Sequence, residues 1–331
     1  MNNKKHEITI AAIQMESFHG MIRENQIRAT KLIEEAANRG AELIVLPELF
    51  SCGYISNPDI WRYGESQDSP TIQWLVETSK RLGIYLGAGL VEIIGNDFVN
   101  EFVLANPKGE IEGRAQKKNA EAYCFRRGKG VHIIHSSLAK IGVGICADNH
   151  FSDFIGHMRE NDVDILLMPH AWPSPSTVSK IVSTEDIQKE EEEIKTFASL
   201  ITSLLGVPSV FVNQIGKIAP MAGIFGGVMN PDSFRLHGFS RIVDAPGRTK
   251  AELMNQEGIA IATVTLDPSC KKNIAIPNFD GWIHPGSTIV RKIIIPIDTL
   301  FGSIYYRLSV KRKIEAKRRR VVSSFYAKGS L

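Results

Sequence analysis

The 331-residue chain has little of several features that would assign it to a class at once. It contains no run of roughly 18 to 20 uninterrupted apolar residues, so no ordinary membrane-spanning helix is expected. Its four cysteines form no CxxC pair, which argues against a disulfide framework or a zinc finger. The glycine-rich signatures of dinucleotide and phosphate sites are missing, and so is HExxH. We therefore expect neither a cofactor nor a metal. Residues 1–7 lack the apolar centre of a secretory signal, which predicts a cytoplasmic location.

The composition is that of a globular protein, with 43% hydrophobic and 23% charged residues. The net charge of +3 is unevenly distributed, because residues 307–320 hold eight basic residues and one acid. The rest of the chain is therefore mildly acidic. A basic tail of this kind is either a solvated terminal helix, a contact for a phospholipid membrane surface, nucleic acid or an acidic partner, or part of an oligomer interface.

Apolar, strand-like runs alternate with segments of helical periodicity, which is typical of a layered α/β fold. In the helix predicted over 184–205, Ser183 and Asp186 predict a capping box, and the acidic run 190–193 is assigned to the solvated face. The alternation of strand-like and helical segments ends after about Asp267. We therefore predict a catalytic domain at 1–268 and a C-terminal extension at 269–331. The predicted strands are 8–14, 42–46, 84–91, 98–105, 111–116, 138–146, 163–168, 209–213, 240–243 and 259–266; the predicted helices are 25–39, 71–82, 154–159 and 184–205.

Three residues could carry chemistry. Cys146 ends a predicted strand and is followed by a sharply polar stretch, and Glu48 comes just after another buried strand. Lys117 ends the second arm of a predicted hairpin. Each has an ordinary alternative, namely a buried strand cysteine, a loop glutamate and a surface lysine. Catalytic groups gather at the carboxyl ends of strands in α/β sheets, which makes Cys146 a fair candidate nucleophile, but none of the three residues is decisive by itself.

The order of several motifs resembles that of the nitrilase superfamily of carbon–nitrogen hydrolases, over about residues 8–267. Leu46-Pro-Glu-Leu49 resembles that family's proline–glutamate motif, and Ile145-Cys-Ala-Asp148 resembles its nucleophile motif. The other matching positions, in order, are Gln14, Gly53-Tyr54, Asn100, Gly109, Lys117, 121–128, 164–169, Ala171-Trp172, Asn213, Gly216, 238–240 and 244–247.

The resemblance implies a four-layer α-β-β-α sandwich that assembles as a homodimer or a larger homo-oligomer. It implies a catalytic triad of Glu48, Lys117 and Cys146, with Glu121 positioning the substrate. The backbone N–H of Ala147 would help to hold the oxyanion, and Trp172 is a further candidate substrate-binding residue. The substrate would be a small amide or N-carbamoyl compound, cleaved through a thioester that releases ammonia or an amine.

Departures from the family pattern leave alternatives open. Ala115-Gln116 replaces an aromatic–arginine pair, so Lys118 competes with Lys117 for the catalytic position. The arginines that bind a substrate carboxylate in carbamoyl amino-acid hydrolases are missing after Asp148, which disfavours such a substrate. A nitrile hydrolase or an amide-forming acyltransferase would use the same triad. A non-catalytic scaffold that keeps the fold is the alternative from another class.

Overall fold

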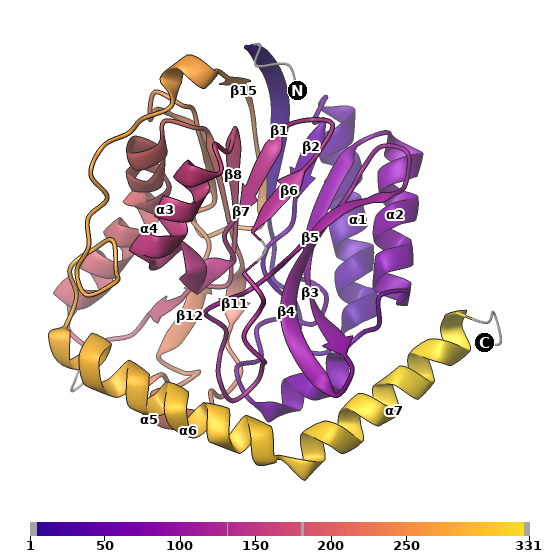
Figure 1. The fold of residues 1–331 in the computed structure, drawn as a ribbon, viewed down its shortest axis with the longest axis vertical. Coiled ribbons are helices and arrows are strands. Elements are labelled where there is room, and N and C mark those ends of the chain that lie inside the picture. Colours follow the sequence, from indigo (N-terminus) through magenta and orange to yellow (C-terminus); the bar gives the residue numbers. More distant parts are fainter. Residues whose placement is uncertain (1–4, 131, 180–181, 328–331) are drawn as a thin grey trace.

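The computed structural model describes residues 5–130, 132–179 and 182–327, and two six-stranded sheets lie at its centre (Figure 1). The first sheet has the order β15-β1-β2-β3-β4-β5 and the second the order β14-β13-β10-β8-β7-β6. Strands β1, β2 and β3 run parallel, as do β7, β8 and β10. The strands of the first sheet are β1 (His6–Gln14), β2 (Leu43–Val45), β3 (Tyr85–Ile94), β4 (Asp97–Ala105), β5 (Ile111–Gln116) and β15 (Gly258–Leu266); those of the second are β6 (Ile133–His135), β7 (Lys140–Val143), β8 (Ile165–His170), β10 (Ser209–Asn213), β13 (Arg241–Val243) and β14 (Thr249–Glu252).

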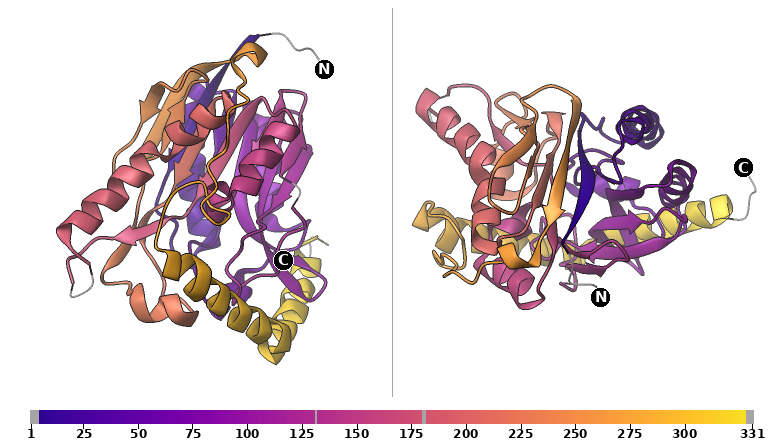
Figure 2. Two further views of the ribbon diagram at one scale, coloured as in Figure 1. Left: turned by 60° about the vertical axis from the view of Figure 1, so that its left-hand side comes forward. Right: turned by 90° about the horizontal axis from the view of Figure 1, so that it is seen from above.

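Helices cover the outer face of each sheet, as the view from above shows (Figure 2). Helices α1 (Ile22–Asn38) and α2 (Pro70–Leu82) pack on the first sheet, and α3 (Ser152–Glu160) and α4 (Thr184–Leu205) pack on the second. Alternate residues of β1 explain this layering, because Ile10 faces the other sheet whereas Ile13 faces the helices. The predicted α-β-β-α sandwich is confirmed.

The local predictions hold for most of the long elements. Helix α4 spans the predicted residues, and its capping box is formed by Ser183 and Asp186. The assignment of the acidic run to the solvated face holds for Glu192, which is exposed, but is wrong for Glu190 and Glu193. Glu190 accepts a hydrogen bond from the indole of Trp172 at 3.1 Å, and Glu193 lies 3.2 Å from His284. A pattern of charges on one helix does not reveal that a distant segment will cover it.

Shorter elements complete the fold. A three-stranded sheet is formed by β9 (Pro173–Pro175), β12 (Phe234–His237) and β11 (Ile215–Lys217). The remaining elements are α5 (Gly223–Val228), the 3-10 turns Pro58–Tyr63, Cys146–His150 and Pro268–Cys270, the π-helical turn Val290–Ile294, and the terminal helices α6 (Ile295–Leu308) and α7 (Val310–Ala327).

The C-terminal strap, residues 289–327, runs along one edge of the body and is drawn in yellow (Figure 1). The hydroxyl of Tyr306 accepts a hydrogen bond from the backbone N–H of Phe98 at 2.8 Å. Arg312 is buried, donates to the carbonyl of Asn96 at 2.6 Å and pairs with Asp97. The strap is therefore bonded to the β3–β4 hairpin, and it is not the simply solvated terminal helix considered as one possibility.

No single helix in the described ranges is long and apolar enough to span a bilayer. One bent pair, 290–308 with 310–321, passes that test on length and composition, with a bend of 59°.

Candidate active site

Glu48, Lys117 and Cys146 come together at one end of the two sheets. Glu48 follows β2 and Lys117 follows β5, whose carboxyl ends lie at the same edge of the first sheet. Cys146 follows β7 of the second sheet and opens the turn Cys146–His150. Packing the sheets face to face therefore brings the three chain segments to one place, as expected for polar residues that follow buried strands.

Glu48 is held by three hydrogen bonds in a fully buried position. Its Oε1 accepts from the ammonium of Lys117 and from the side-chain amide of Asn100, each at 2.7 Å. Its Oε2 accepts from the backbone N–H of Ala171 at 2.9 Å. Such a fixed carboxylate has one defined orientation, which favours a catalytic role over a loose surface one.

Lys117 lies between two carboxylates. Its Nζ is 2.7 Å from Glu48 and 2.8 Å from Oε1 of Glu121, and its side chain is fully buried. The hydroxyl of Tyr54 also donates to Glu121, at 3.2 Å. Lys118 points outward, where its ammonium pairs with Asp153 at 2.7 Å and is 43% exposed. The structure thus places Lys117, and not Lys118, against Glu48.

The turn that presents Cys146 has a strained backbone. The predicted strand 138–146 is wrong at its end, because β7 stops at Val143. Cys146 has a positive φ of 47°, which non-glycine residues seldom adopt. Asn149 closes the turn by donating to the carbonyls of Gly144 and Cys146, at 2.6 and 3.2 Å. A Cβ on Gly144 would lie 1.9 Å from the Asn149 amide oxygen, so glycine is required there.

Asp148 links the turn Cys146–His150 to the segment that follows β5. Its buried carboxylate accepts from the backbone N–H groups of Asn119 and Lys118, at 2.8 and 3.3 Å. The sequence offered Asp148 and Asn149 only as neighbours of the cysteine. Their positioning roles depend on contacts within the turn and across the site that spacing alone does not reveal.

Burial dominates the electrostatics of these groups. It raises the pKa of Cys146 well above that of an ordinary thiol, and the negative charge of Glu48 adds to the effect. Burial also raises the pKa of Glu48, although Lys117 opposes this. For Lys117, burial acts to lower the pKa, but the charges of Glu121 and Glu48 together outweigh it and raise the pKa well above the usual value. The resting arrangement is therefore a protonated thiol beside an ammonium group and a carboxylate with a high affinity for protons.

A cavity of about 710 Å³ lies against this cluster. Glu121, which binds Lys117, and Ala147, which follows Cys146, both line it. Trp172 is not among its lining residues, because its indole is bonded to Glu190 and packs against His150 and Phe197. The C-terminal extension also lines the cavity, with Trp282, Ile295, Thr299 and Tyr306.

Comparison with known proteins decides the family. A family model described as carbon–nitrogen hydrolase matches residues 9–270, which is most of the chain. The chain belongs to the carbon–nitrogen hydrolase family. Accordingly, it is a hydrolase of carbon–nitrogen bonds other than peptide bonds.

The relatives of this hydrolase include differently named enzymes. It is 30% identical over 198 residues to a nitrilase of Pyrococcus abyssi, an alignment that covers 54% of this chain and 75% of the relative. It is 25% identical over 284 residues to the 2-oxoglutaramate amidase of Bacillus subtilis, covering 82% of this chain and 96% of the relative. The structure of a carbon–nitrogen hydrolase from Helicobacter pylori G27 superposes with a TM-score of 0.69 at 22% identity, covering 80% of this chain and 90% of that one. The likeness to this solved structure supports the assignment of the fold.

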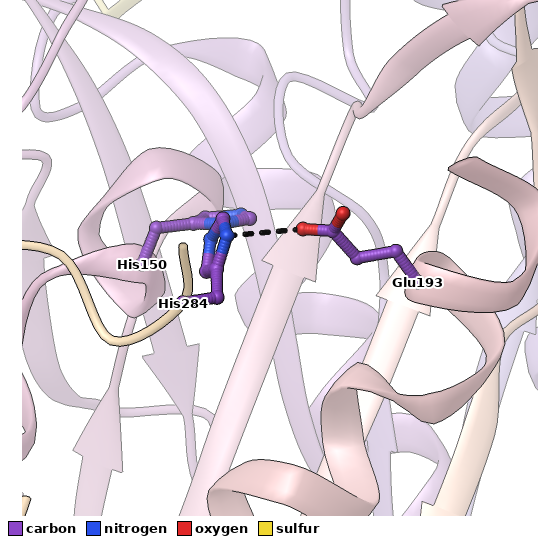
Figure 3. A group of neighbouring side chains, drawn as sticks. All are labelled: His150, Glu193 and His284. Carbon is purple, nitrogen blue, oxygen red and sulfur yellow. Dashed lines mark hydrogen bonds and ion pairs between the residues drawn. The ribbon is translucent and has the colours of Figure 1, made fainter. Parts of the chain in front are cut away.

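The hydrolase has one group of described side chains that could hold a metal ion, namely His150, Glu193 and His284 (Figure 3). The rings of His150 and His284 are hydrogen-bonded, with 2.8 Å between Nδ1 of the first and Nε2 of the second. Nδ1 of His284 faces Glu193 at 3.2 Å. The three side chains therefore satisfy one another's hydrogen-bonding atoms by direct contact. A tetrahedral zinc ion would require the two ring nitrogens to separate to roughly 3.3 Å.

The C-terminal extension of the hydrolase is also attached to the turn Cys146–His150 and to the residues that follow it. The backbone N–H of Ile283 donates to the carbonyl of His150 at 2.9 Å, and that of Ser152 donates to Gly281 at 2.8 Å. Trp282 packs on Phe151 with ring centroids 4.6 Å apart. The extension therefore braces the segment that follows Cys146.

The buried histidines predict how the stability of the hydrolase depends on pH. Burial lowers the pKa of His170 to about 3, below the ordinary 6.5 that it regains on unfolding. The unfolded chain therefore binds the extra proton, and the stability associated with the neutral ring is lost as the pH falls through about 6.5. From pH 7 to pH 5, the free energy of unfolding should fall by about 2 kcal/mol more in the wild type than in His170→Asn. Urea unfolding at both pH values measures this difference, and equal pH dependence in the two proteins would contradict it.

Proposed function

We propose that the hydrolase is a cysteine-dependent amidase. It cleaves a small amide or N-carbamoyl substrate through a thioester on Cys146 and releases ammonia or an amine. The observation that carries the proposal is the buried Glu48–Lys117–Glu121 cluster, whose charges act on Cys146, together with the cavity that Glu121 and Ala147 line. Two carboxylates and one ammonium leave a surplus negative charge in a dry site, which favours uptake of a proton by Glu48.

In the first step, Glu48 takes the proton of the Cys146 thiol as sulfur attacks the carbonyl carbon. Because the pKa of the thiol is raised, proton transfer and attack occur together, and no free thiolate accumulates beforehand. The carbonyl oxygen becomes an oxyanion. The Lys117 ammonium and the backbone N–H of Ala147 hold this charge.

In the second step, Glu48 returns the proton to the departing nitrogen. The carbon–nitrogen bond breaks, and the acyl group remains on Cys146 as a thioester. Glu48 then takes a proton from water, whose oxygen attacks the thioester carbon. The carbon–sulfur bond breaks, the acid is released, and the thiol recovers its proton from Glu48. Glu121 keeps the Lys117 ammonium in place throughout.

The arginines expected after Asp148 for a substrate carboxylate are missing, but we further propose that Arg126, from another segment, binds an anionic group of the substrate. Arg126 lines the cavity, and its buried Nε and Nη2 have no hydrogen-bond partner among the described residues. Its Nη1 lies 3.7 Å from Asp97, too far for a hydrogen bond. A carboxylate would satisfy the two open donors. The Bacillus relative, whose name specifies an amide that carries a carboxylate, supports this choice over a neutral amide.

Ammonia release from a panel of substrates tests both proposals. We expect a dicarboxylic acid monoamide such as glutaramate to be cleaved more efficiently than butyramide. In Arg126→Gln, the KM for glutaramate should rise about 10- to 100-fold, which is the effect of losing a charge-assisted hydrogen bond. The kcat/KM for butyramide is the control and should not change. Equal losses for both amides would contradict the role of Arg126, and silence across amides, carbamoyl amines and nitriles would contradict the amidase assignment.

All four cysteines are free thiols. This supports our proposal that the enzyme works in the cytoplasm, where thiols stay reduced.

A further inference from the structure

The face of the C-terminal strap that points away from the body is apolar. Large side chains recur there every three or four residues and stay in solvent; Phe301 is 58% exposed and Leu308 is 72% exposed. We call this set the apolar stripe. It consists of Ile289, Ile293, Ile297, Leu300, Phe301, Ile304 and Leu308 along α6 and the turn before it, and of Val310, Ile314 and Val321 along α7.

The opposite face of the strap is attached to the body, so the stripe cannot turn inward. On α6, Tyr306 is bonded to Phe98, and Ile295 lines the cavity. On α7, Arg312 is bonded to Asn96, and Arg319 donates to the carbonyl of Gly64 at 3.0 Å. These bonds fix the outward direction of the stripe. A fixed apolar face of this length marks an interaction site.

Cations flank the stripe. Arg307, Lys313 and Lys317 are exposed and have no ion-pair partner in the described part of the chain. Further exposed cations each have one polar partner: Lys311 with Asp59, Arg318 with Glu315, and Arg320 with Asn96. Long basic side chains can lay their stems along apolar surface while their charges reach polar groups beside it. An apolar stripe bordered by lysine and arginine is the pattern of a helix that lies in a membrane interface.

We propose that the strap binds the surface of an anionic phospholipid bilayer. The helices lie in the plane of the interface, with the apolar stripe at the boundary between headgroups and acyl chains and the cations on lipid phosphates. The bent pair does not span the bilayer, because the face that carries Tyr306 and Arg312 is bonded to protein. Since Ile295 lines the cavity from the same helix, α6 would separate the active-site cavity from the lipid.

A second copy of the chain fits this surface less well. A twofold interface places the same surface of each copy against the other, and an axis near the α6–α7 junction would bring Arg307, Lys313 and Lys317 of one strap close to those of the other. Like charges in such an interface oppose association. Lipid phosphates supply the opposite charge, and the acyl region supplies an apolar environment.

Vesicle co-sedimentation of the full chain tests the stripe. We expect binding to phosphatidylcholine vesicles that contain phosphatidylglycerol and much weaker binding to phosphatidylcholine alone. The double variant Leu300→Glu, Ile304→Glu should bind the anionic vesicles at least about tenfold more weakly. The matched control is Ile27→Glu with Met254→Glu, which places the same charges on exposed apolar residues elsewhere and should bind as the wild type does. Thermal unfolding checks that each variant is folded.

A second pair of variants tests the cations. Lys313→Glu with Lys317→Glu should weaken binding at least about tenfold, whereas Lys31→Glu with Lys250→Glu makes the same charge change elsewhere and should have a smaller effect. Failure of the wild type to bind anionic vesicles would overturn the proposal, as would equal effects of test and control pairs. Sedimentation velocity without vesicles tests whether a second copy of the chain covers the stripe instead of lipid. If the stripe variant breaks an oligomer that the wild type forms, a second copy covers the stripe and the proposal is wrong.

Discussion

Replacing Cys146 with alanine is expected to lower kcat for amide hydrolysis by about a thousandfold or more. The substitution removes the atom that forms the thioester, and the remaining groups can only orient water against the amide. The fold should survive, because Cys146 lies in a short turn at the cavity edge and alanine is smaller than cysteine. The rates of ammonia release by the wild type and by Cys146→Ala, measured under single-turnover conditions, test this expectation.

Cys270 provides the matched control for this substitution. It is also partly exposed, but it lies in the turn Pro268–Cys270, outside the active-site cluster. Cys270→Ala should keep the wild-type rate. If Cys146→Ala retains a rate within about tenfold of the wild type, sulfur is not the nucleophile and the mechanism is wrong.

Replacing Lys117 with methionine is expected to lower kcat by about a hundred- to thousandfold, which is the usual effect of losing one oxyanion donor. It should also change the pH dependence of the rate. The pKa of Glu48 is already raised by burial, and Lys117 is the group that opposes this rise. Without the ammonium, the pKa of Glu48 should rise further, so the base becomes available only at higher pH. The acidic limb of kcat/KM should therefore move to higher pH.

Lys118→Met removes the same charge one residue away. That ammonium is exposed and pairs with Asp153, so the variant should keep both the rate and the pH profile of the wild type. The two variants separate a buried catalytic lysine from its neighbour, an ambiguity that the sequence left open. Comparable losses in both would mean that the segment after β5 is sensitive to any change and that Lys117 has no special role.

The sequence predicted the parts of this protein that depend on local patterns. Buried strands and amphipathic helices are visible in hydrophobic periodicity, and the helix 184–205 with its capping box was predicted residue for residue. Glu48 and Lys117 could be proposed because each falls on a motif that resembles one of the nitrilase superfamily. The distance of 2.7 Å between Lys117 Nζ and Glu48 Oε1 follows once the strands pair in the sheet.

Features that depend on distant segments could not be predicted in this way. The acidic run of α4 looked solvated, yet His284, nearly a hundred residues away, covers Glu193. The C-terminal strap looked like a basic tail, because nothing in its own sequence shows that Tyr306 is bonded to the β3–β4 hairpin. Arg126 lies in the family-like segment 121–128, but nothing in that segment singles it out as a binding residue. Its significance comes from two buried donors beside a cavity. Assembly into a homo-oligomer stays a prediction.

Trapping the acyl-enzyme tests the central claim most directly. The wild-type enzyme is mixed with an amide that it hydrolyses, quenched in acid within the first turnover and digested with a protease. The mass of the peptide that contains Cys146 is then measured by mass spectrometry. We predict that this peptide gains the mass of the acyl group, that alkaline hydroxylamine removes it, and that Cys146→Ala gains nothing at this position. Release of ammonia without any acylation of Cys146 would contradict a thioester mechanism.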